Sequence, residues 1–161
     1  MALLFIIALV LVFCFSFVLI FGPPYLPTLS PQVESAFDLL DLKAGQTLIE
    51  LGSGDGKIML AAAKRGYLVV GYELNPLLYI FSLLRTIGYR KQVKVYCKNI
   101  WQADWPKADG IFTFLLNRQM NKLDKRLKDY EHKPVKVASF AFKIPNKEIS
   151  AQKKGVYLYE Y

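Results

Sequence analysis

The most hydrophobic stretch of the chain is its beginning, where residues 2–21 carry no charged side chain. Twenty helical residues extend for about 30 Å, which matches the hydrocarbon core of a bilayer. The pattern therefore predicts one transmembrane helix over residues 1–22. A cleaved signal peptide is the alternative, although its apolar core usually spans about 7–15 residues after a basic start, and no basic start is present here.

Residues 23–31, PPYLPTLSP, contain four prolines and predict an extended linker. Nine or ten extended residues reach at most about 33 Å, so the linker keeps the next segment close to the predicted membrane helix. Residues 32–161 are then expected to form one folded domain, beginning with a short amphipathic helix that ends before Gly45.

Beyond Gly45, apolar runs alternate with amphipathic segments that are bounded by Pro or Gly. Apolar runs predict strands, and the amphipathic segments predict helices. The predicted strands are 47–51, 67–73, 93–97, 111–116, 135–142 and 155–161, and the predicted helices between them are 57–65, 76–87 and 119–130. The alternation is typical of an α/β fold with a parallel sheet.

Strand position within the sheet follows from the apolar pattern. Strand 93–97 alternates apolar and polar residues, whereas 111–116 is apolar almost throughout. Central parallel strands are buried on both faces, so 93–97 is placed at an edge and 111–116 in the centre. This fits the Rossmann-like order 3-2-1-4-5. Because no helix-length segment precedes it, strand 155–161 is expected to pair antiparallel with 135–142.

Cysteine and histidine content narrows the chemistry. Cys14 lies in the predicted membrane helix and Cys97 in a predicted strand, so both are expected to be packing residues and no disulfide framework is indicated. His132 is the only histidine, and no Cys or His pair has metal-ligand spacing. A metal site and a Ser/His/Asp triad are therefore not expected.

The net charge of +8 is concentrated in the second half of the chain. Residues 1–84 hold 4 Lys or Arg against 6 Asp or Glu, while residues 85–161 hold 17 against 7. A basic surface suits anionic lipid headgroups beside a predicted membrane helix, and nucleic acid is the rival partner. A solvated surface without a partner is the third interpretation.

In the segment Ile49–Ile58, IELGSGDGKI, Glu50 lies near the end of a predicted strand, and three glycines and Asp55 follow it. The dinucleotide fingerprint G-x-G-x-x-G fails here because the third glycine comes one residue early, and Glu50 and Asp55 would repel a pyrophosphate. A cationic ligand reverses that argument. S-adenosylmethionine carries a sulfonium and an ammonium, and glycines let it approach the backbone closely.

Glu73 ends the next strand, where its carboxylate can accept hydrogen bonds from two ribose hydroxyls. Each acid also has a simpler interpretation. Asp55 could cap the following helix, Glu50 could be a surface acid at a strand end, and Glu73 could merely precede the turn at Asn75.

The motifs LIELGSGDGKI and VVGYELNP resemble motifs I and II of class I S-adenosylmethionine-dependent methyltransferases. Together with PYLPT (24–28) and FLLNRQMNKL (114–123), they resemble the membrane-anchored lysine methyltransferases that act on the ATP synthase c-subunit and on adenine nucleotide translocase. The resemblance runs from about residue 23 to the end. It implies a seven-stranded sheet, against which this chain is expected to lack one strand and the last crossover helix.

Carried over by position, the resemblance implies two sets of site residues. Those expected to bind the cofactor are Glu50, Gly52, Ser53, Gly54, Asp55, Gly56, Glu73, Leu74, Asn99, Ile100 and Leu115. Those expected near the substrate are Tyr25, Thr28, Trp101, Leu116 and Asn117.

Several of these residues have a second interpretation. The family commonly has an acid where this chain has Asn99, so Asn99 either accepts from the adenine amino group or forms a turn. Trp101 could be packing, Tyr25 an interfacial anchor and Asn117 a helix cap. No general base is identified.

We therefore hypothesise a single-pass membrane protein with a cytosolic domain, because the cofactor is made in the cytosol, that methylates lysines of a membrane protein. A nucleic-acid methyltransferase is the second hypothesis. Enzymes of that kind commonly carry Asp/Asn-Pro-Pro-aromatic after the fourth strand, whereas this chain has LLNR (115–118). A small-molecule methyltransferase and a noncatalytic membrane-anchored module are the remaining alternatives.

Overall fold

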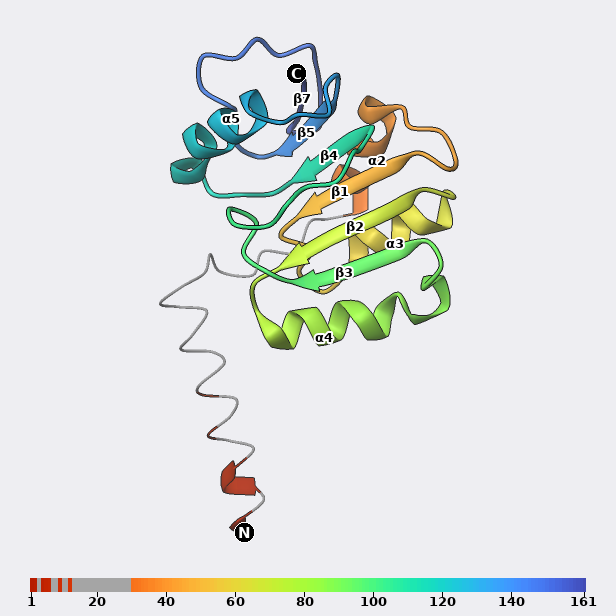
Figure 1. Ribbon diagram of the computed structural model, residues 1–161, viewed down its shortest axis with the longest axis vertical. Helices are drawn as coiled ribbons and strands as arrows, with labels where there is room; N and C mark the ends of the chain where they lie inside the picture. Colours follow the sequence, from red (N-terminus) through yellow and green to blue (C-terminus); the bar gives the residue numbers. More distant parts are fainter. Residues whose placement is uncertain (3, 7–8, 10–11, 13–29) are drawn as a thin grey trace.

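In the computed structural model of the chain, the described residues are 1–2, 4–6, 9, 12 and 30–161 (Figure 1). Most of the predicted membrane helix, 1–22, and of the linker, 23–31, lies outside them, as do Cys14, Tyr25 and Thr28. Within the described part, none of the helices combines the length and hydrophobicity needed to cross a bilayer.

From residue 30 to the end, the helices and strands lie close to the predicted ranges. The helices are α2 (Ser30–Leu40), α3 (Lys57–Lys64), α4 (Pro76–Arg85) and α5 (Met120–Lys128), with 3₁₀ turns η1 (Ile87–Tyr89) and η2 (Asn117–Gln119). The strands are β1 (Thr47–Leu51), β2 (Leu68–Glu73), β3 (Val93–Cys97), β4 (Gly110–Thr113), β5 (Lys136–Phe140), β6 (Ala151–Lys153) and β7 (Val156–Glu160).

The described strands form one sheet in the order β3-β2-β1-β4-β5-β7-β6. Strands β1 to β5 are parallel, and β7 runs antiparallel between β5 and β6. The predicted order, the edge position of β3 and the antiparallel last strand are confirmed. The expectation of a missing strand is wrong, because β6 completes a sheet of seven described strands. With three residues and one apolar side chain, β6 gives no periodic signal.

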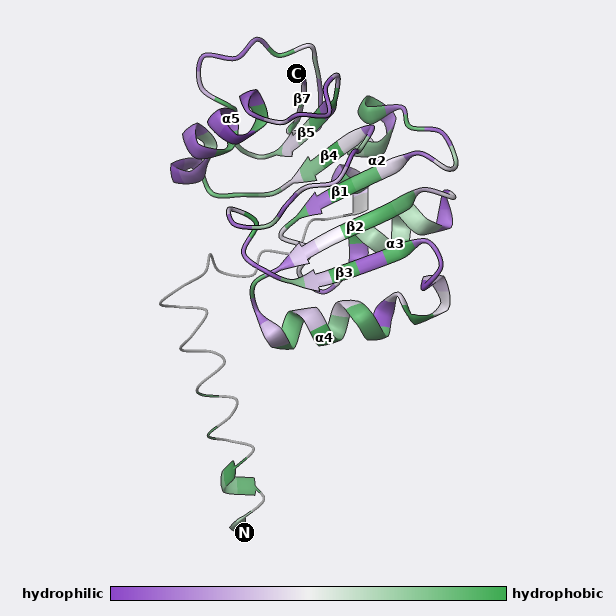
Figure 2. Cartoon of the chain, viewed as in Figure 1, coloured by the Kyte–Doolittle hydropathy of each residue, from purple (hydrophilic) through white to green (hydrophobic). Residues whose placement is uncertain are grey.

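Each face of the sheet has its own core (Figures 1 and 2). Helices α2 and α3 cover one face, with Phe37, Leu40 and Met59 among the buried residues. Helix α5 and the loop 98–109 cover the other face, with Leu123 and Trp105 among the buried residues. Because both faces are covered, the carboxyl ends of the parallel strands are the place where a ligand can reach the sheet.

Helix α4 lies beside the edge strand β3 and begins as its sequence predicts. The Asn75 side chain accepts a hydrogen bond from the Leu77 backbone N–H at 2.9 Å, and Pro76 occupies the first helical position. The prediction that Cys97, in β3, is a packing residue is wrong, because its side chain is exposed. An edge strand has no neighbour to cover its outer residues, which explains the difference.

Candidate functional site

The glycine turn after β1 folds over the end of β2. Gly52, Gly54 and Gly56 all have left-handed backbone angles, with φ of 86°, 54° and 80°. The Gly52 and Ser53 backbone N–H groups both donate to the Tyr72 carbonyl, at 3.0 and 2.9 Å. The turn therefore presses its backbone against β2 and brings the acids of the two strands to one place.

Open space lies on one side of this turn and close packing on the other. A Cβ at Gly52 would meet no atom within 4 Å, whereas a Cβ at Gly56 would lie 2.8 Å from Cα of Ser82 in α4. In β2, a Cβ at Gly71 would lie 2.2 Å from Sδ of Met59. Gly56 and Gly71 thus permit helix packing, while Gly52 leaves room for a ligand against the backbone.

Glu73 is held rigidly at the end of β2. Its Oε2 accepts from the Gly54 N–H at 2.8 Å, and its Oε1 accepts from the Asn75 N–H at 2.8 Å. The residue is only 9% exposed. A carboxylate has about four acceptor positions, so both oxygens can still accept from a pair of hydroxyl groups. Glu73 does precede and bind the turn at Asn75, as one interpretation had it. This role does not conflict with ligand binding.

Glu50 is the most unusual residue of the site. It is 2% exposed, and its Oε2 has no hydrogen-bond partner. Burial raises the pKa of the Glu50 carboxyl well above its usual range, the nearby Glu73 and Asp55 carboxylates raise it further, and a hydrogen bond from the Met59 backbone opposes the rise. The interpretation of Glu50 as a surface acid is therefore wrong.

Ser53 shares this environment, since it is 3% exposed and its hydroxyl also lacks a partner. Buried polar atoms normally have partners, and each exception calls for an explanation. An ammonium group has three N–H donors and would suit both Glu50 Oε2 and Ser53 Oγ. Beside the open space at Gly52, the donor set thus fits a ligand with an amino group.

Asp55 is engaged in a way that its sequence context did not indicate. Its Oδ2 lies 2.6 Å from Nη1 of Arg85 in α4, and its Oδ1 accepts from the Lys57 N–H at 3.2 Å. The capping interpretation is thus correct in part. Arg85 therefore offsets the Asp55 charge. Arg85 gave no sequence signal, since it lies 30 residues away.

The loop after β3 carries Asn99, Ile100 and Trp101. The Asn99 side-chain carbonyl accepts from the Trp101 N–H at 3.0 Å, which is the turn-forming arrangement. Ile100 is 9% exposed, and Trp101 is half-buried beneath Lys122, whose Nζ lies 4.6 Å from the ring centroid. Packing thus accounts for the position of Trp101, and a contact of Asn99 with adenine stays a prediction.

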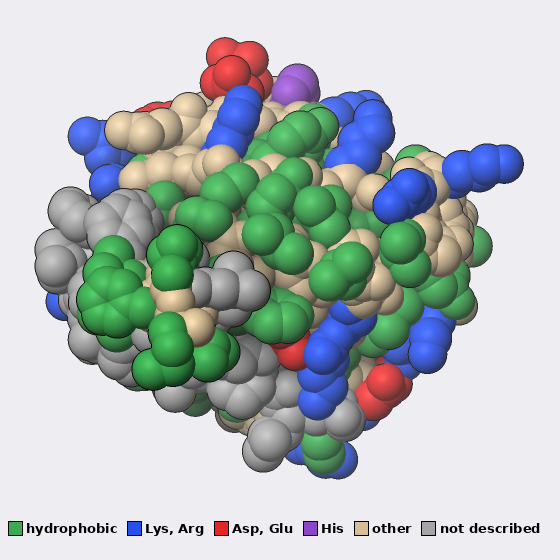
Figure 3. Space-filling model, turned by 90° about the horizontal axis from the view of Figure 1, so that it is seen from below, with side chains coloured by type: hydrophobic (Ala, Val, Ile, Leu, Met, Phe, Trp, Pro, Cys, Tyr) green, Lys and Arg blue, Asp and Glu red, His purple; other side chains and the backbone are tan. Residues whose placement is uncertain are grey.

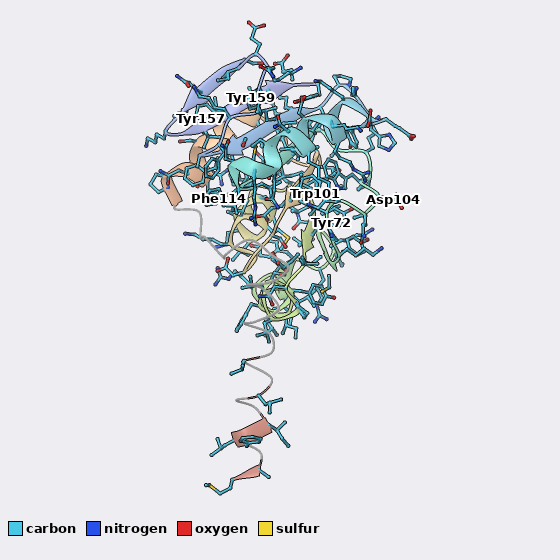
Figure 4. All side chains as sticks on the ribbon, turned by 90° about the vertical axis from the view of Figure 1, so that its left-hand side faces the viewer. Tyr72, Trp101, Asp104, Phe114, Tyr157 and Tyr159 are labelled. Carbon is cyan, nitrogen blue, oxygen red and sulfur yellow. The ribbon has the colours of Figure 1, made fainter. Side chains whose placement is uncertain are left out.

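Tyr72 holds this loop against the sheet and was not among the predicted site residues. Its hydroxyl donates to the Asp104 carbonyl at 2.7 Å (Figure 4). Its ring stacks on Tyr96, with the two ring centroids 5.7 Å apart. Burial, as the main cause, raises the pKa of Tyr72 to about 12, so the hydroxyl remains a donor. Its position directly before Glu73 in a mostly apolar strand was the available signal.

The loop after β4 contains Leu115, Leu116 and Asn117. Leu115 is buried, Leu116 is half-buried and Asn117 is exposed at the start of η2. The prediction that Asn117 caps the next helix is wrong, because the capping group is the Gln119 side chain, which accepts from the Leu116 N–H at 3.3 Å. The exposed Asn117 side chain is therefore free of a capping role.

Among the residues that the structure describes, no group of three His, Cys, Asp or Glu side chains is arranged to hold a metal ion. The acids described above converge instead around backbone amides and open space. The site as a whole can bind a cationic, hydroxyl-bearing ligand at the carboxyl ends of β1 and β2.

The chain is similar to known proteins over much of its length. The model of the ANTKMT methyltransferase domain family matches residues 50–151. The ATP synthase c-subunit lysine N-methyltransferase of Xenopus laevis is 32% identical over 125 residues, which cover 76% of this chain and 55% of that protein. The adenine nucleotide translocase lysine N-methyltransferase of Mus musculus is 31% identical over 125 residues, which cover 76% and 54%. The chain thus spans about half the length of these relatives.

Among solved structures, an RNA methyltransferase from Salinibacter ruber in complex with S-adenosyl-L-homocysteine has a TM-score of 0.77 and 26% sequence identity. The match covers 84% of this chain and 92% of that one. The sheet order and the similarity over nearly the whole of that protein show the same fold.

Proposed function

Because the chain belongs to the ANTKMT methyltransferase domain family, we propose that it is an S-adenosylmethionine-dependent methyltransferase whose acceptor is a lysine amine. The observation that carries the proposal is the pair of buried, unpartnered oxygens of Glu50 and Ser53 beside the open space at Gly52. Glu50 and Ser53 would hold the ammonium of the cofactor, and Glu73 would hold its ribose hydroxyls.

The cofactor supplies a methyl group on a sulfonium, and the transfer to an amine is an in-line displacement. The protein's part is then to align the two groups and to exclude water. Rigid anchors suit this role, because Glu73 is fixed by two backbone N–H groups and the glycine turn by hydrogen bonds to Tyr72. The acceptor lysine must lose its proton before attack, and desolvation in a water-poor site lowers its pKa.

The acceptor is proposed to be a lysine of a membrane-associated protein. The support is the substrates for which the two relatives are named, the ATP synthase c-subunit and adenine nucleotide translocase, and the uncharged run of residues 2–21. In this proposal residues 1–22 anchor the enzyme and the linker 23–31 confines the site to the bilayer surface. Tyr25, Thr28, Trp101, Leu116 and Asn117 stay candidates for contact with the acceptor.

RNA is the second candidate acceptor. The Salinibacter ruber protein is named an RNA methyltransferase, and residues 85–161 hold 17 basic against 7 acidic side chains. Membranes and RNA can be supplied together with cofactor that carries a radioactive methyl group. Label in membrane protein that survives nuclease supports the lysine proposal, whereas label in RNA alone supports the second candidate.

Cofactor binding can be tested with two glycines that share a backbone conformation. Gly52 and Gly45 have φ of 86° and 85°, and a Cβ at either would meet no protein atom within 4 Å. Each Ala variant therefore carries a similar strain of about 1–2 kcal/mol. Only Gly52→Ala places a methyl group in the proposed ligand space, so it should lose binding of S-adenosylhomocysteine in calorimetry.

Gly45→Ala is the matched control and should bind as the wild type does. Equal binding by both variants would show that the ligand does not lie against Gly52. Equal loss in both would mean that strain, rather than the ligand space, controls binding, and the assignment would then fail.

A further inference from the structure

Helix α4 buries a small polar residue and exposes large apolar ones, which is unusual for a helix on the surface of a domain. Its fully buried residue is Ser82, which packs against Gly56, and the neighbouring Thr86 is 3% exposed. Four of its large apolar side chains are exposed instead, with exposed fractions of 49% for Ile80, 57% for Phe81, 40% for Leu83 and 59% for Leu84. Ile87, in the following turn η1, is 52% exposed.

A surface helix normally buries its apolar stripe and exposes its polar side. Here Ser82 is buried because it packs against the glycine turn, so closely that a Cβ added at Gly56 would lie 2.8 Å from the Ser82 Cα. The remaining apolar residues form one patch on the side of the molecule that is seen in Figure 3. Contiguous exposed patches of this kind mark interaction sites.

The surroundings of the patch are cationic. Between Glu73 and Asp104, residues 74–103 contain no acid, and their charged residues are Arg85, Arg90, Lys91, Lys94 and Lys98. The last four follow the helix, in β3 or in the segments on either side of it, and are exposed. Figure 3 shows Lys and Arg side chains around the apolar surface, together with Asp or Glu side chains at its lower margin in that view. An apolar helix face with a basic margin is the arrangement that lies in the headgroup region of a bilayer.

We propose that α4 docks on a bilayer that contains anionic lipids, with Ile80, Phe81 and Leu84 inserted among the lipids. A second copy of the chain is the less suitable occupant, because face-to-face pairing would bring two cationic margins together. Anionic headgroups complement that margin. The docking proposal rests on the exposed apolar residues and the charges around them, and it does not depend on which molecule accepts the methyl group.

This orientation would place the candidate site beside the membrane. A groove of about 500 Å³, lined by Asp55, Leu78, Phe81, Leu84 and Arg85, joins the apolar face of α4 to the glycine turn. If the proposed methyl transfer is correct, docking through α4 holds the glycine turn close to the bilayer surface, where lysines of membrane proteins are exposed. Docking and catalysis are nevertheless measured separately.

The test places a fluorescent reporter on α4 in the full chain, so that any effect of residues 1–22 is the same in every sample. Phe81→Trp puts an indole on the patch, and Glu131→Trp puts one at an exposed position after α5, on the other side of the sheet. Both variants are mixed with vesicles of brominated phosphatidylcholine, with or without phosphatidylglycerol. The wild-type spectrum, which reports Trp101 and Trp105, is subtracted from each.

We expect bromine to quench the indole at position 81 and not the one at 131, and we expect stronger quenching with phosphatidylglycerol. In the Phe81→Trp background, Arg90→Gln and Lys91→Gln should each lower the docked-to-undocked ratio about fivefold on anionic vesicles. Lys107→Gln, an exposed lysine outside the cationic margin, is the control and should change little.

Equal quenching at positions 81 and 131, or quenching that ignores the anionic lipid, would overturn the proposal. So would an emission at position 81 that is already blue-shifted without vesicles, since another part of the protein would then cover the patch. A blue shift that grows with protein concentration would instead identify a second copy as the occupant. If the protein docked on vesicles as expected but did not bind S-adenosylhomocysteine, the proposed function would be refuted and the docking proposal would stand.

Discussion

At the scale of single residues, the site is marked by an imbalance between burial and hydrogen bonding. Glu50 and Ser53 are nearly inaccessible, and each has a side-chain oxygen without a partner. Glu73, by contrast, is paired through both oxygens. A buried acid without a partner lowers the stability of the folded state, and a ligand that supplies donors removes that penalty.

The raised pKa of Glu50 predicts how stability changes with pH. Below its ordinary pKa of 4.5, the carboxyl is protonated in both the folded and the unfolded state, so it does not change stability with pH there. Above 4.5 the unfolded chain releases the proton first, while the folded protein retains it up to its own higher pKa. The folded state then binds more protons, so stability falls as pH rises, by up to about 1.4 kcal/mol per pH unit.

Glu50→Gln should abolish this loss. The difference in unfolding free energy between variant and wild type, from urea denaturation, should grow in favour of the variant as pH rises above 4.5. Because Gln keeps an acceptor for the Met59 backbone but has no charge, the variant should also bind S-adenosylhomocysteine more weakly. A pH-independent stability difference would contradict the assigned pKa shift.

Sequence alone predicted Glu50, Asp55 and Glu73 as the acids of the site, because they lie at strand ends and in a glycine turn. It could not show which of them is neutralised. The Asp55–Arg85 pair joins residues 30 positions apart, and the cap at Leu116 comes from Gln119 rather than Asn117. Such partners depend on tertiary packing and on side-chain reach, which local patterns do not encode.

At the scale of elements, glycines set how closely helices approach the sheet. Gly71 in β2 accommodates Met59 of α3, and Gly56 accommodates Ser82 of α4. The helices and strands themselves were predictable from apolar periodicity and from punctuation such as Asn75–Pro76 and Gly66. The outward face of α4 was not, because a helix with apolar residues on nearly every side does not reveal which side is buried.

Gly71→Ala is expected to disturb the packing of α3 on β2. The added Cβ would lie 2.2 Å from Met59 Sδ and 3.1 Å from Ser53 Cβ, so the helix or the turn must shift. Overpacking of this kind costs about 1–3 kcal/mol of unfolding free energy. The control is Gly88→Ala, where a Cβ would meet nothing within 4 Å and little change is expected. Equal losses in thermal or urea unfolding would show that the packing at Gly71 is not special.

At the scale of the whole molecule, one sheet has a hydrophobic core on each face. The candidate site lies at the carboxyl ends of its parallel strands, between the two cores. The order of the parallel strands was predictable, because edge and central strands differ in their apolar pattern. The hairpin of β6 and β7 was only half predicted, since β6 is held by backbone pairing to β7 rather than by its own side chains.

Ligand binding at the strand ends should stabilise the whole domain. A ligand that binds only the folded state at about a hundred times its Kd adds about 2.7 kcal/mol to the unfolding free energy. Trp105 lies in the core beneath α5, where its indole N–H donates to the Ile100 carbonyl at 3.1 Å. Thermal unfolding followed by tryptophan fluorescence should thus shift upward with S-adenosylhomocysteine. Gly52→Ala should show no shift, and a similar shift in that variant would place the ligand elsewhere.

The two edge strands of the sheet also affect whether copies of the protein aggregate at high concentration. Strand β3 exposes Lys94, and β6 exposes Lys153, which pairs with Asp38 at 2.6 Å, directly before Lys154. An unpaired edge strand is a template for pairing with another chain, and lysine is a residue that blocks such pairing. A second copy that approached either edge would bring like charges face to face. The basic residues that suit a negatively charged surface therefore also protect the sheet from edge-to-edge aggregation.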